Sequence, residues 1–239
     1  MVISSLDNSK VKEVVKLQNK KYRDETNLFV VETSHLVEEA KKAGLIKELF
    51  IYDKEFVDSD DINYVTADVM KKMSSLESPS NVLAICNKKE EKEINGNVLI
   101  LDGVQDPGNL GTIIRSAIAF NIDTVILSND SVDLYNSKVL RATEGMIFNI
   151  NIIRRDLNKI LPELKNKYTI YTTNVVNGTR LEDIKVNKPF ALIMGSEGNG
   201  VKDSIASYAD ESVYINMNDK CESLNVGVAT SIILYEFNK

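Results

Sequence analysis

The stretch LDGVQDPGNLGTIIRSAIAF, residues 101–120, decides how this chain is expected to fold. An apolar strand leads into a loop that contains glycine and proline, and a helix follows. One face of that helix carries apolar residues at helical spacing, namely Leu110, Ile113, Ile114, Ala117 and Ile118. A strand followed by a packed helix indicates an α/β fold.

Two polar residues of this stretch need a separate explanation. Asn109 is well placed to cap the helix. Arg115 lies off the apolar face near the helix N-terminus, where a cation opposes the helix dipole. Arg115 therefore either pairs with an acidic side chain or meets an anion that the helix N-terminus also attracts. The glycines do not match a dinucleotide or Walker fingerprint, so a plain structural turn stays open as an alternative.

Two later loops have the same polar, glycine-rich character. IMGSEGNGV, residues 193–201, has several glycines around Glu197, which allow a backbone to approach a ligand closely. INMNDKCESLNVGVATSI, residues 215–232, has polar residues at the start of an apolar helix. Ser223 could be a plain N-cap there. Gly227 lowers helix stability, which indicates close packing or close approach of a ligand.

The chain divides into two parts at NKKEEKEINGN, residues 87–97, a densely charged segment that is typical of a linker. Before it, short strands and helices predict a small α/β unit. After it, apolar strands and helices alternate, which predicts a parallel sheet covered by helices. Ligands of such sheets bind at the carboxyl ends of the strands. The loops at 102–111, 195–200 and 216–225 fall at or near such ends.

Composition narrows the class of protein. The net charge of −6 argues against a protein that coats nucleic acid without specificity. Residues 1–23 nevertheless carry six basic and two acidic side chains, which fits either a local RNA patch or a solvated helix face. We see no membrane-spanning run and no secretory signal. The two cysteines are far apart and lack metal-ligand spacing, so we expect a reduced, cytoplasmic protein without a bound metal.

The three loops together resemble the motifs of one family. The first motif is Asn109-x-Gly111-x-x-x-Arg115, the second runs from Gly195 to Gly200, and the third is ESLNV at 222–226. In this order and spacing they are similar to the SpoU (TrmH) family of the SPOUT superfamily of RNA methyltransferases. The resemblance is strong over 97–239 and weaker in the N-terminal part.

The resemblance implies an α/β fold with two domains. Residues 97–239 would form the SPOUT catalytic domain, with a parallel sheet and a deep trefoil knot. Residues 1–93 would form a small α/β RNA-recognition domain that resembles a ribosomal protein. The family is homodimeric, with its active site near the dimer interface. The knot and the dimer are implied by the resemblance alone.

The implied reaction is transfer of a methyl group from S-adenosylmethionine to a ribose 2′-hydroxyl of RNA, and the expected RNA is 23S ribosomal RNA. The implied cofactor contacts are Gly195, Ile215, Met217 and Leu224, with Thr173 as a weaker candidate. Arg115 corresponds to the catalytic arginine. The residues that would orient it and the hydroxyl are Asn109, Glu197, Ser223 and Asn225. Lys21 and Arg23 are candidate RNA contacts.

Some questions stay open at this point. Arg115 could accept the 2′-hydroxyl proton, or it could hold an RNA phosphate and stabilise the developing alkoxide, which is the safer statement for a guanidinium. A transfer RNA methyltransferase and a non-catalytic ribosome assembly factor are the alternatives. The target nucleotide, and a housekeeping role as against antibiotic resistance, do not follow from the residues.

A few positions depart from the family pattern. Thr33 and Asn121 stand where a glycine is common, and Glu144 stands where a small or Met-type residue is usual. Asn216 and Gly227 replace a common proline and serine. These departures leave the catalytic set intact and put the identity of the RNA target in doubt.

Overall fold

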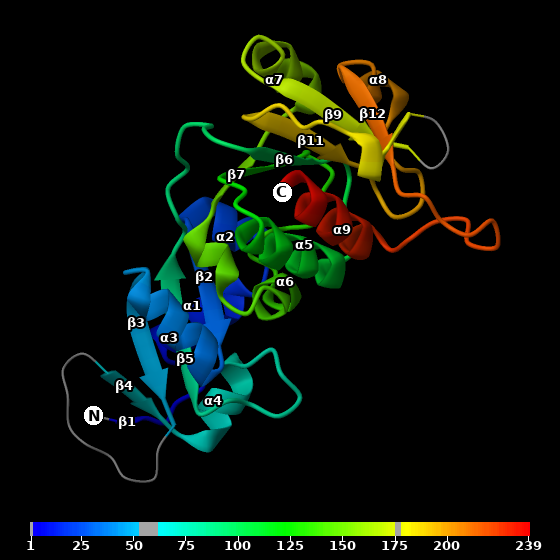
Figure 1. The fold of residues 1–239 in the computed structure, drawn as a ribbon. Coiled ribbons are helices and arrows are strands. Elements are labelled where there is room, and N and C mark those ends of the chain that lie inside the picture. The colour runs from blue at the N-terminus through cyan, green and yellow to red at the C-terminus, as the bar shows by residue number, and fades with distance from the viewer. Residues whose placement is uncertain (1, 53–61, 175–177) are drawn as a thin grey trace. The chain divides into compact units, whose positions relative to one another are not determined.

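The computed structural model describes every residue except 1, 53–61 and 175–177, and the chain forms two compact units (Figure 1). Unit 1 comprises residues 1–90 and 133–148, and unit 2 comprises residues 91–132 and 149–239. The first transition, near residue 90, falls in the charged segment that the sequence indicated as a linker. The return of residues 133–148 to unit 1 was not anticipated.

Unit 1 is a five-stranded mixed sheet with helices. Its elements are β1 Val2–Ile3, α1 Ser9–Leu17, α2 Lys20–Thr26, β2 Leu28–Glu32, α3 Ser34–Lys42, β3 Ile46–Ile51, β4 Ile62–Val65, α4 Ala67–Met73, β5 Val82–Asn87 and α6 Ser137–Ala142, with a 3-10 turn η1 at Met146–Asn149. The strand order is β1-β4-β3-β5-β2. Strand β5 runs antiparallel to β2 and β3, whereas β4 is parallel to β1 and β3. The core includes Val11, Val14 and Leu17 of α1, which are buried against the sheet and α4.

Local capping in unit 1 refines the helix boundaries. Asn19 accepts from the Lys21 backbone N–H and starts α2, so the basic N-terminal segment is two helices rather than one. The Thr33 side chain caps α3 by accepting from the Leu36 backbone N–H. Gly44 adopts a left-handed conformation after α3, which is typical of the residue that ends a helix.

Residues 133–148 join unit 1 through buried contacts. Asp133 forms an ion pair with Arg23 at 2.5 Å. The Tyr135 ring lies 4.6 Å from that of Phe29, and Phe148 lies 6.1 Å from the same ring. The segment follows a strand of unit 2 in the sequence, and these contacts explain why it packs with unit 1 instead.

Unit 2 is the α/β unit that the sequence predicted. Its elements are β6 Val98–Leu101, α5 Pro107–Ala119, β7 Thr124–Leu127, β8 Asn151–Arg154, α7 Leu157–Leu164, β9 Thr169–Thr173, β10 Thr179–Arg180, η2 Leu181–Asp183, β11 Phe190–Met194, α8 Asp203–Ala206, β12 Glu211–Tyr214 and α9 Val226–Phe237. The strand order is β10-β12-β9-β11-β6-β7-β8, and all the pairs are parallel.

Helices cover both faces of this sheet. Helices α7 and α8 pack on one face, where Leu161 and Ile205 join a buried cluster with Ile193 of β11. Helices α5 and α9 lie side by side on the other face (Figure 1). There Phe237 of α9 packs edge-on against Tyr171 and Phe190. The predicted parallel sheet is confirmed, and the trefoil knot stays a prediction.

Two of the departures from the family pattern sit where the backbone favours glycine. Thr33 has φ +87° and Asn121 has φ +58°. L-residues rarely adopt these left-handed conformations, and glycine adopts them without a steric penalty. Glu144 is left-handed as well, at φ +50°, beside Gly145. The common glycines therefore have a backbone explanation that does not involve the RNA target.

Candidate functional site

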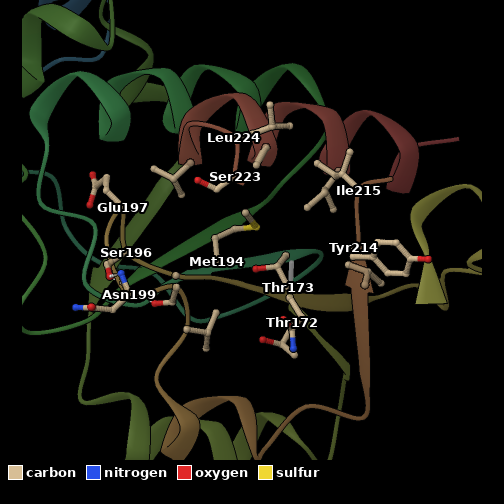
Figure 2. Close-up of a pocket in the computed structure, with 18 of the residues that line it drawn as sticks. Thr172, Thr173, Met194, Ser196, Glu197, Asn199, Tyr214, Ile215, Ser223 and Leu224 are labelled. Carbon is tan, nitrogen blue, oxygen red and sulfur yellow. Dashed lines mark hydrogen bonds between the residues drawn. The ribbon is translucent and has the colours of Figure 1, made fainter. Parts of the chain in front are cut away.

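A cavity of about 760 Å³ opens at the carboxyl ends of three parallel strands of unit 2 (Figure 2). Its wall comes from the ends of β9, β11 and β12 and from the segment that leads into α9. The predicted cofactor contacts Thr173, Gly195, Ile215, Met217 and Leu224 all line it, as do Glu197, Ser223 and Asn225. Asn174 and Tyr214 line it as well; sequence reasoning missed them, although both lie at ends of predicted strands.

The loop after β11 is a tight hairpin that exposes backbone to the cavity. Ser196 and Gly200 exchange backbone hydrogen bonds of 3.0 and 3.2 Å. A side chain on Gly195 would place its Cβ only 1.9 Å from the carbonyl carbon of Gly200. Only glycine fits at this position, so its presence follows from the packing of the hairpin itself.

The three motifs are joined by a chain of side-chain hydrogen bonds. Asn109 Nδ2 donates to Glu197 Oε1 at 2.9 Å, and Asn225 Nδ2 donates to Asn109 Oδ1 at 2.8 Å. Glu197 also accepts from the backbone N–H of Asp106 at 3.1 Å. Residues separated by about ninety positions or more in the chain thus hold one another at the rim of the cavity.

The ionisation of Glu197 follows from these donors. Burial acts to raise the pKa of the Glu197 carboxyl, but hydrogen bonds from Asn109 and from nearby backbone N–H groups outweigh it and lower the pKa below its ordinary value. Glu197 is therefore a carboxylate at neutral pH, and it holds the loop after β6 as an acceptor.

Two predicted caps are wrong. Asp106, not Asn109, caps α5 by accepting from the Asn109 backbone N–H at 2.8 Å, and Pro107 follows it at the start of the helix. Asn225, not Ser223, caps α9 by accepting from the backbone N–H groups of Gly227 and Val228. The Asn109 side chain is thereby left for Glu197, and Ser223 stands exposed at the cavity.

Gly227 is explained by packing between helices. A Cβ there would lie 3.2 Å from side-chain atoms of Thr112 on α5, which is tighter than most real contacts. Nearby, the hydroxyls of Ser116 and Ser231 are 2.6 Å apart. Small residues thus allow α5 and α9 to approach closely, so Gly227 marks the helix crossing.

Arg115 is exposed on α5. Its guanidinium makes no hydrogen bond or ion pair with any of the residues that the structure describes. The sequence suggested that Arg115 either pairs with an acidic side chain or meets an anion. No acidic partner is present among the described residues. The side chain is available for an anion from outside.

The two candidate RNA contacts of unit 1 differ sharply. Lys21 is exposed, with Glu25 at 3.8 Å. Arg23 is 5% exposed, donates to the carbonyls of Leu17 and Gln18, and pairs with Asp133. The prediction that Arg23 contacts RNA is therefore corrected, since its guanidinium is used inside unit 1.

The basic excess of residues 1–23 is partly neutralised in the fold. Lys10 pairs with Glu48 at 2.8 Å, Lys12 with Asp7 at 2.9 Å, and Lys20 with Asp24 at 2.5 Å. Counting charges within residues 1–23 overstated the local positive charge, because Glu48 of β3 and Asp24 of α2 lie outside that segment and pair with two of its lysines.

The part of the chain that the structure describes lacks both a membrane-spanning helix and a metal-binding cluster. No helix there is long and apolar enough to cross a membrane. No group of three or more His, Cys, Asp or Glu side chains in the same residues could hold a metal ion.

Comparison with known proteins agrees with this geometry. Residues 96–235 match the SpoU rRNA Methylase family, and residues 8–84 match the MRM3-like substrate binding domain. The chain belongs to the SpoU rRNA methylase family, as its three motifs predicted, and the class it represents is an RNA methyltransferase.

Particular relatives cover almost the whole chain. It is 39% identical over 241 residues to the 23S rRNA (guanosine(2553)-2′-O)-methyltransferase RlmP of Bacillus subtilis strain 168, across 98% of this chain and 97% of that protein. The AdoMet-bound rRNA methyltransferase of Sinorhizobium meliloti is 29% identical with a TM-score of 0.87, covering 99% of this chain and 97% of that one. An RNA 2′-O ribose methyltransferase structure is 26% identical with a TM-score of 0.83, covering 99% and 98%. The predicted fold class and enzyme class are confirmed.

Proposed function

We propose that this chain methylates a ribose 2′-hydroxyl of 23S ribosomal RNA with S-adenosylmethionine as methyl donor. The observation that carries the proposal is the set of hydrogen bonds that joins Glu197, Asn109 and Asn225, and with them the three motifs, at the cavity. Arg115 lies on the same helix as Asn109 and has no partner among the described residues. The full-length similarity to a 23S ribosomal RNA 2′-O-methyltransferase supports the choice of substrate.

The cavity fits the cofactor by shape and chemistry. A backbone hairpin with glycine at its closest approach offers N–H and C=O groups without side-chain obstruction. Ile215, Met217 and Leu224 provide apolar wall, and Thr173 lies at the end of β9. When bound, S-adenosylmethionine supplies an electrophilic methyl group. We assign Gly195, Ile215, Met217, Leu224 and Thr173 to holding it.

Arg115 is assigned to the RNA side of the reaction. Methylation would form the O–CH3 bond, break the S–CH3 bond to leave S-adenosylhomocysteine, and release the 2′-hydroxyl proton to solvent, so negative charge develops on that oxygen. A guanidinium stays protonated in proteins, which favours a donor over a base. Arg115 would hold an RNA phosphate through paired N–H groups and stabilise the oxygen as its proton leaves. Glu197 and Asn225 hold the Asn109 side chain on the same helix as Arg115, and Ser223 lines the cavity.

The two units divide the work. Unit 1 contains the match to a substrate binding domain, so we assign it to RNA recognition, with exposed Lys21 as a contact. Residues 97–239 contain the match to the methylase family and are assigned to catalysis, apart from the segment 133–148 that packs with unit 1. With ribosomal RNA as substrate, the proposed location is the cytoplasm.

A homodimer is part of the proposal. Val228, Ile232 and Tyr235 form one exposed apolar stripe along α9, with 46%, 38% and 56% of their surface accessible. Exposed apolar residues at this helical spacing favour burial against another surface. A second copy of the chain is the proposed occupant. Sedimentation should show a dimer, and Ile232→Lys should shift it toward monomer.

The direct test is to map 2′-O-methyl groups in ribosomal RNA from cells with and without this protein. Loss of one 23S methylation, restored by the wild-type chain, is the expected result. Loss of a transfer RNA methylation instead would favour the alternative substrate. A calorimetric titration without S-adenosylmethionine binding would favour a non-catalytic assembly factor.

A further inference from the structure

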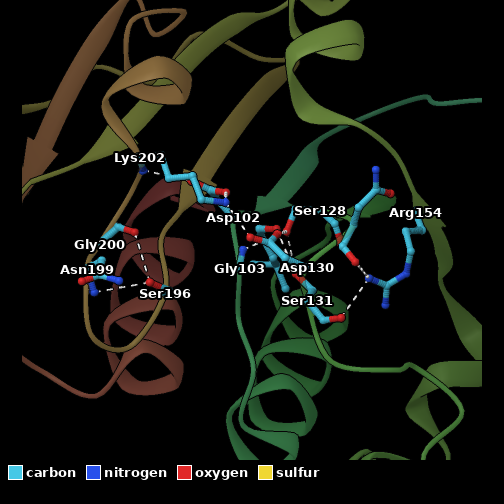
Figure 3. Close-up of polar contacts among 12 residues, drawn as sticks. Asp102, Gly103, Ser128, Asp130, Ser131, Arg154, Ser196, Asn199, Gly200 and Lys202 are labelled. Atoms are coloured by element: carbon cyan, nitrogen blue, oxygen red, sulfur yellow. Dashed lines mark hydrogen bonds and ion pairs between the residues drawn. The ribbon is translucent and has the colours of Figure 1, made fainter.

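Both ends of the hairpin 195–201 are attached to one residue, Asp102 at the end of β6. The Asp102 backbone N–H donates to the carbonyl of Met194, just before the hairpin, at 2.9 Å. Its carboxylate accepts from Lys202, just after the hairpin, through the backbone N–H at 2.9 Å and through Nζ at 3.0 Å. Figure 3 shows Lys202 reaching over to Asp102.

Asp102 needs Lys202 for electrostatic reasons. Its carboxylate is buried, with 1% exposure, and within the described residues its hydrogen-bond donors are the two groups of Lys202. A buried carboxylate without a compensating charge is costly. The Lys202 side chain is half exposed, so the interaction is desolvated mainly at the Asp102 end.

A second carboxylate, that of Asp130, extends this network to Gly103, at the start of the loop between β6 and α5. Lys202 Nζ lies 2.6 Å from Asp130, which accepts from the Ser128 hydroxyl at 2.6 Å. Ser128 in turn accepts from the backbone N–H of Gly103 at 2.8 Å. Hydrogen bonding to these carboxylates raises the pKa of Lys202, and the Lys202 ammonium lowers the pKa of Asp130, so both groups are charged at neutral pH.

The far end of the network is held by an arginine. Arg154 Nη1 donates to the carbonyls of Ser128 and Ser131 at 2.6 and 2.9 Å (Figure 3). Its Nη2 donates to the carbonyl of Val132. The loop that carries Asp130 is therefore held on β8, and Lys202 pairs with a side chain of that loop.

We propose that Lys202, through Asp102, is a positioning residue that latches the hairpin 195–201 in place. This rests on the proposed function, because the hairpin carries Gly195 at the cavity and Glu197 on Asn109. Neither Asp102 nor Lys202 lines the cavity, so the pair acts through the hairpin. The hairpin is internally closed between Ser196 and Gly200, so its position depends on its two ends.

The test compares Lys202→Met with two matched variants in the full chain. Lys202→Met should weaken S-adenosylmethionine binding about tenfold and lower kcat further, since misplaced groups lose catalysis steeply. Lys202→Arg should restore most of both, because it keeps the charge and the reach. Lys159→Met, which removes an exposed lysine of α7, should bind and turn over like the wild type.

A smaller effect is expected from Asp130→Asn, about twofold, because this half-exposed pair is screened by water. Amide hydrogen exchange should quicken at 196–202 in Lys202→Met and stay unchanged in α7. A purely structural residue would lower the melting temperature and leave the binding of the folded protein intact, which would overturn the proposal.

Each remaining outcome is informative. Wild-type affinity and turnover in Lys202→Met would refute the latch. If that variant does not fold, Lys202→Gln, which keeps a donor, gives the same readouts; unfolding of both would assign the pair to the fold and overturn the proposal. Failure of the wild type to bind S-adenosylmethionine would instead refute the proposed function.

Discussion

Two arginines, one in each unit, show opposite uses of the same side chain. Arg115 on α5 of unit 2 is exposed and has no hydrogen-bonding or ionic partner in the described residues. Arg23 on α2 of unit 1 is buried, pairs with Asp133 and donates to two backbone carbonyls. Both were candidates for contact with RNA on sequence grounds.

The two arginines differ in whether their guanidinium groups already have partners within the described protein. A guanidinium that is buried and paired with a carboxylate and backbone carbonyls inside the protein stabilises the fold and is not accessible to a ligand. An exposed guanidinium without a partner among the described residues contributes no contact there to the fold and is available for an anion. Activity and stability should therefore separate cleanly between the two positions.

The largest expected effect is that of a substitution at Arg115 on the methylation rate. Arg115→Ala should lower the methylation rate about 1,000-fold, because it removes a donor to the developing charge. S-adenosylmethionine affinity and melting temperature should stay close to wild type. Single-turnover assays with ribosomal RNA and calorimetry measure the two quantities.

Two variants sharpen that result. Arg115→Lys should recover only part of the rate, since an ammonium lacks the paired donors of a guanidinium. Arg155→Ala, which removes an exposed arginine paired with Glu91, is the control and should be nearly silent. An equal loss of cofactor affinity in Arg115→Ala would refute the assignment of Arg115 to the RNA side.

The buried arginine should show the reverse pattern. Arg23→Met should lower the free energy of unfolding by about 3 kcal/mol, because it leaves the Asp133 carboxylate without its partner in a buried place. Denaturant unfolding monitored in unit 1 measures it. The double variant Arg23→Met/Asp133→Leu should recover part of the loss, as it removes the stranded charge.

Lys21→Met provides the contrast on the same helix. It should leave unfolding unchanged and weaken RNA binding slightly, since Lys21 is exposed. If Arg23→Met were as stable as wild type and lost RNA binding, the comparison between the two arginines would fail.

Glu197 is an intermediate case, an exposed carboxylate that accepts hydrogen bonds from donors of its own chain. Glu197→Gln should lower the methylation rate about tenfold at neutral pH, because charge-assisted hydrogen bonds to the loop after β6 become neutral ones. The pKa of Glu197 is lowered from 4.5, so its stabilising contribution is complete above pH 4.5 and is lost as the pH falls through the lowered value.

Melting curves across pH check this directly. The melting temperature of the wild type should exceed that of Glu197→Gln above pH 4.5, and the gap should close at lower pH. A gap that widened on acidification would mean that the neutral acid, not the carboxylate, holds the loop.

The smallest expected effect concerns the two cysteines, which differ in burial as the two arginines do. Cys86 is buried, and burial raises the pKa of its thiol to about 12, whereas Cys221 is exposed, two positions before Ser223 of the cavity wall. A thiol reagent should modify Cys221 alone in the native protein and both cysteines in denaturant. Cys221→Ser should abolish the native reaction, and S-adenosylmethionine should slow it. Rapid native labelling of Cys86 would contradict its burial.

Particular residues show which features of the structure can be predicted from the sequence. The strand at 98–101, the helix from 107 and the parallel sheet were predicted because apolar periodicity reports which face of an element is buried. Gly195 was singled out from local composition, and its hairpin bears that out. Caps were less predictable: Asp106 and Asn225 took the places expected for Asn109 and Ser223, because neighbouring polar residues compete for the same backbone N–H groups.

Other features depend on partners that are distant in the chain. Arg23 and Lys202 look alike in the sequence as ordinary surface cations. Their functions depend on Asp133 and Asp102, which lie about one hundred positions away and become neighbours only after folding. The packing of residues 133–148 with unit 1 is of the same kind.

The amino-acid sequence alone predicts the family, the strand–loop–helix units and the residues of the three motifs, because each of these depends on the spacing of residues that are close together in the chain. Folding adds the assignment of those residues to partners. Within the described residues it leaves Arg115 without a partner, pairs Arg23 with Asp133, joins Asn109 to Glu197 and Asn225, and closes the hairpin ends on Asp102. The physical reason is that burial and hydrogen bonding are properties of pairs of groups in space, and spacing along one chain cannot specify which pairs will meet.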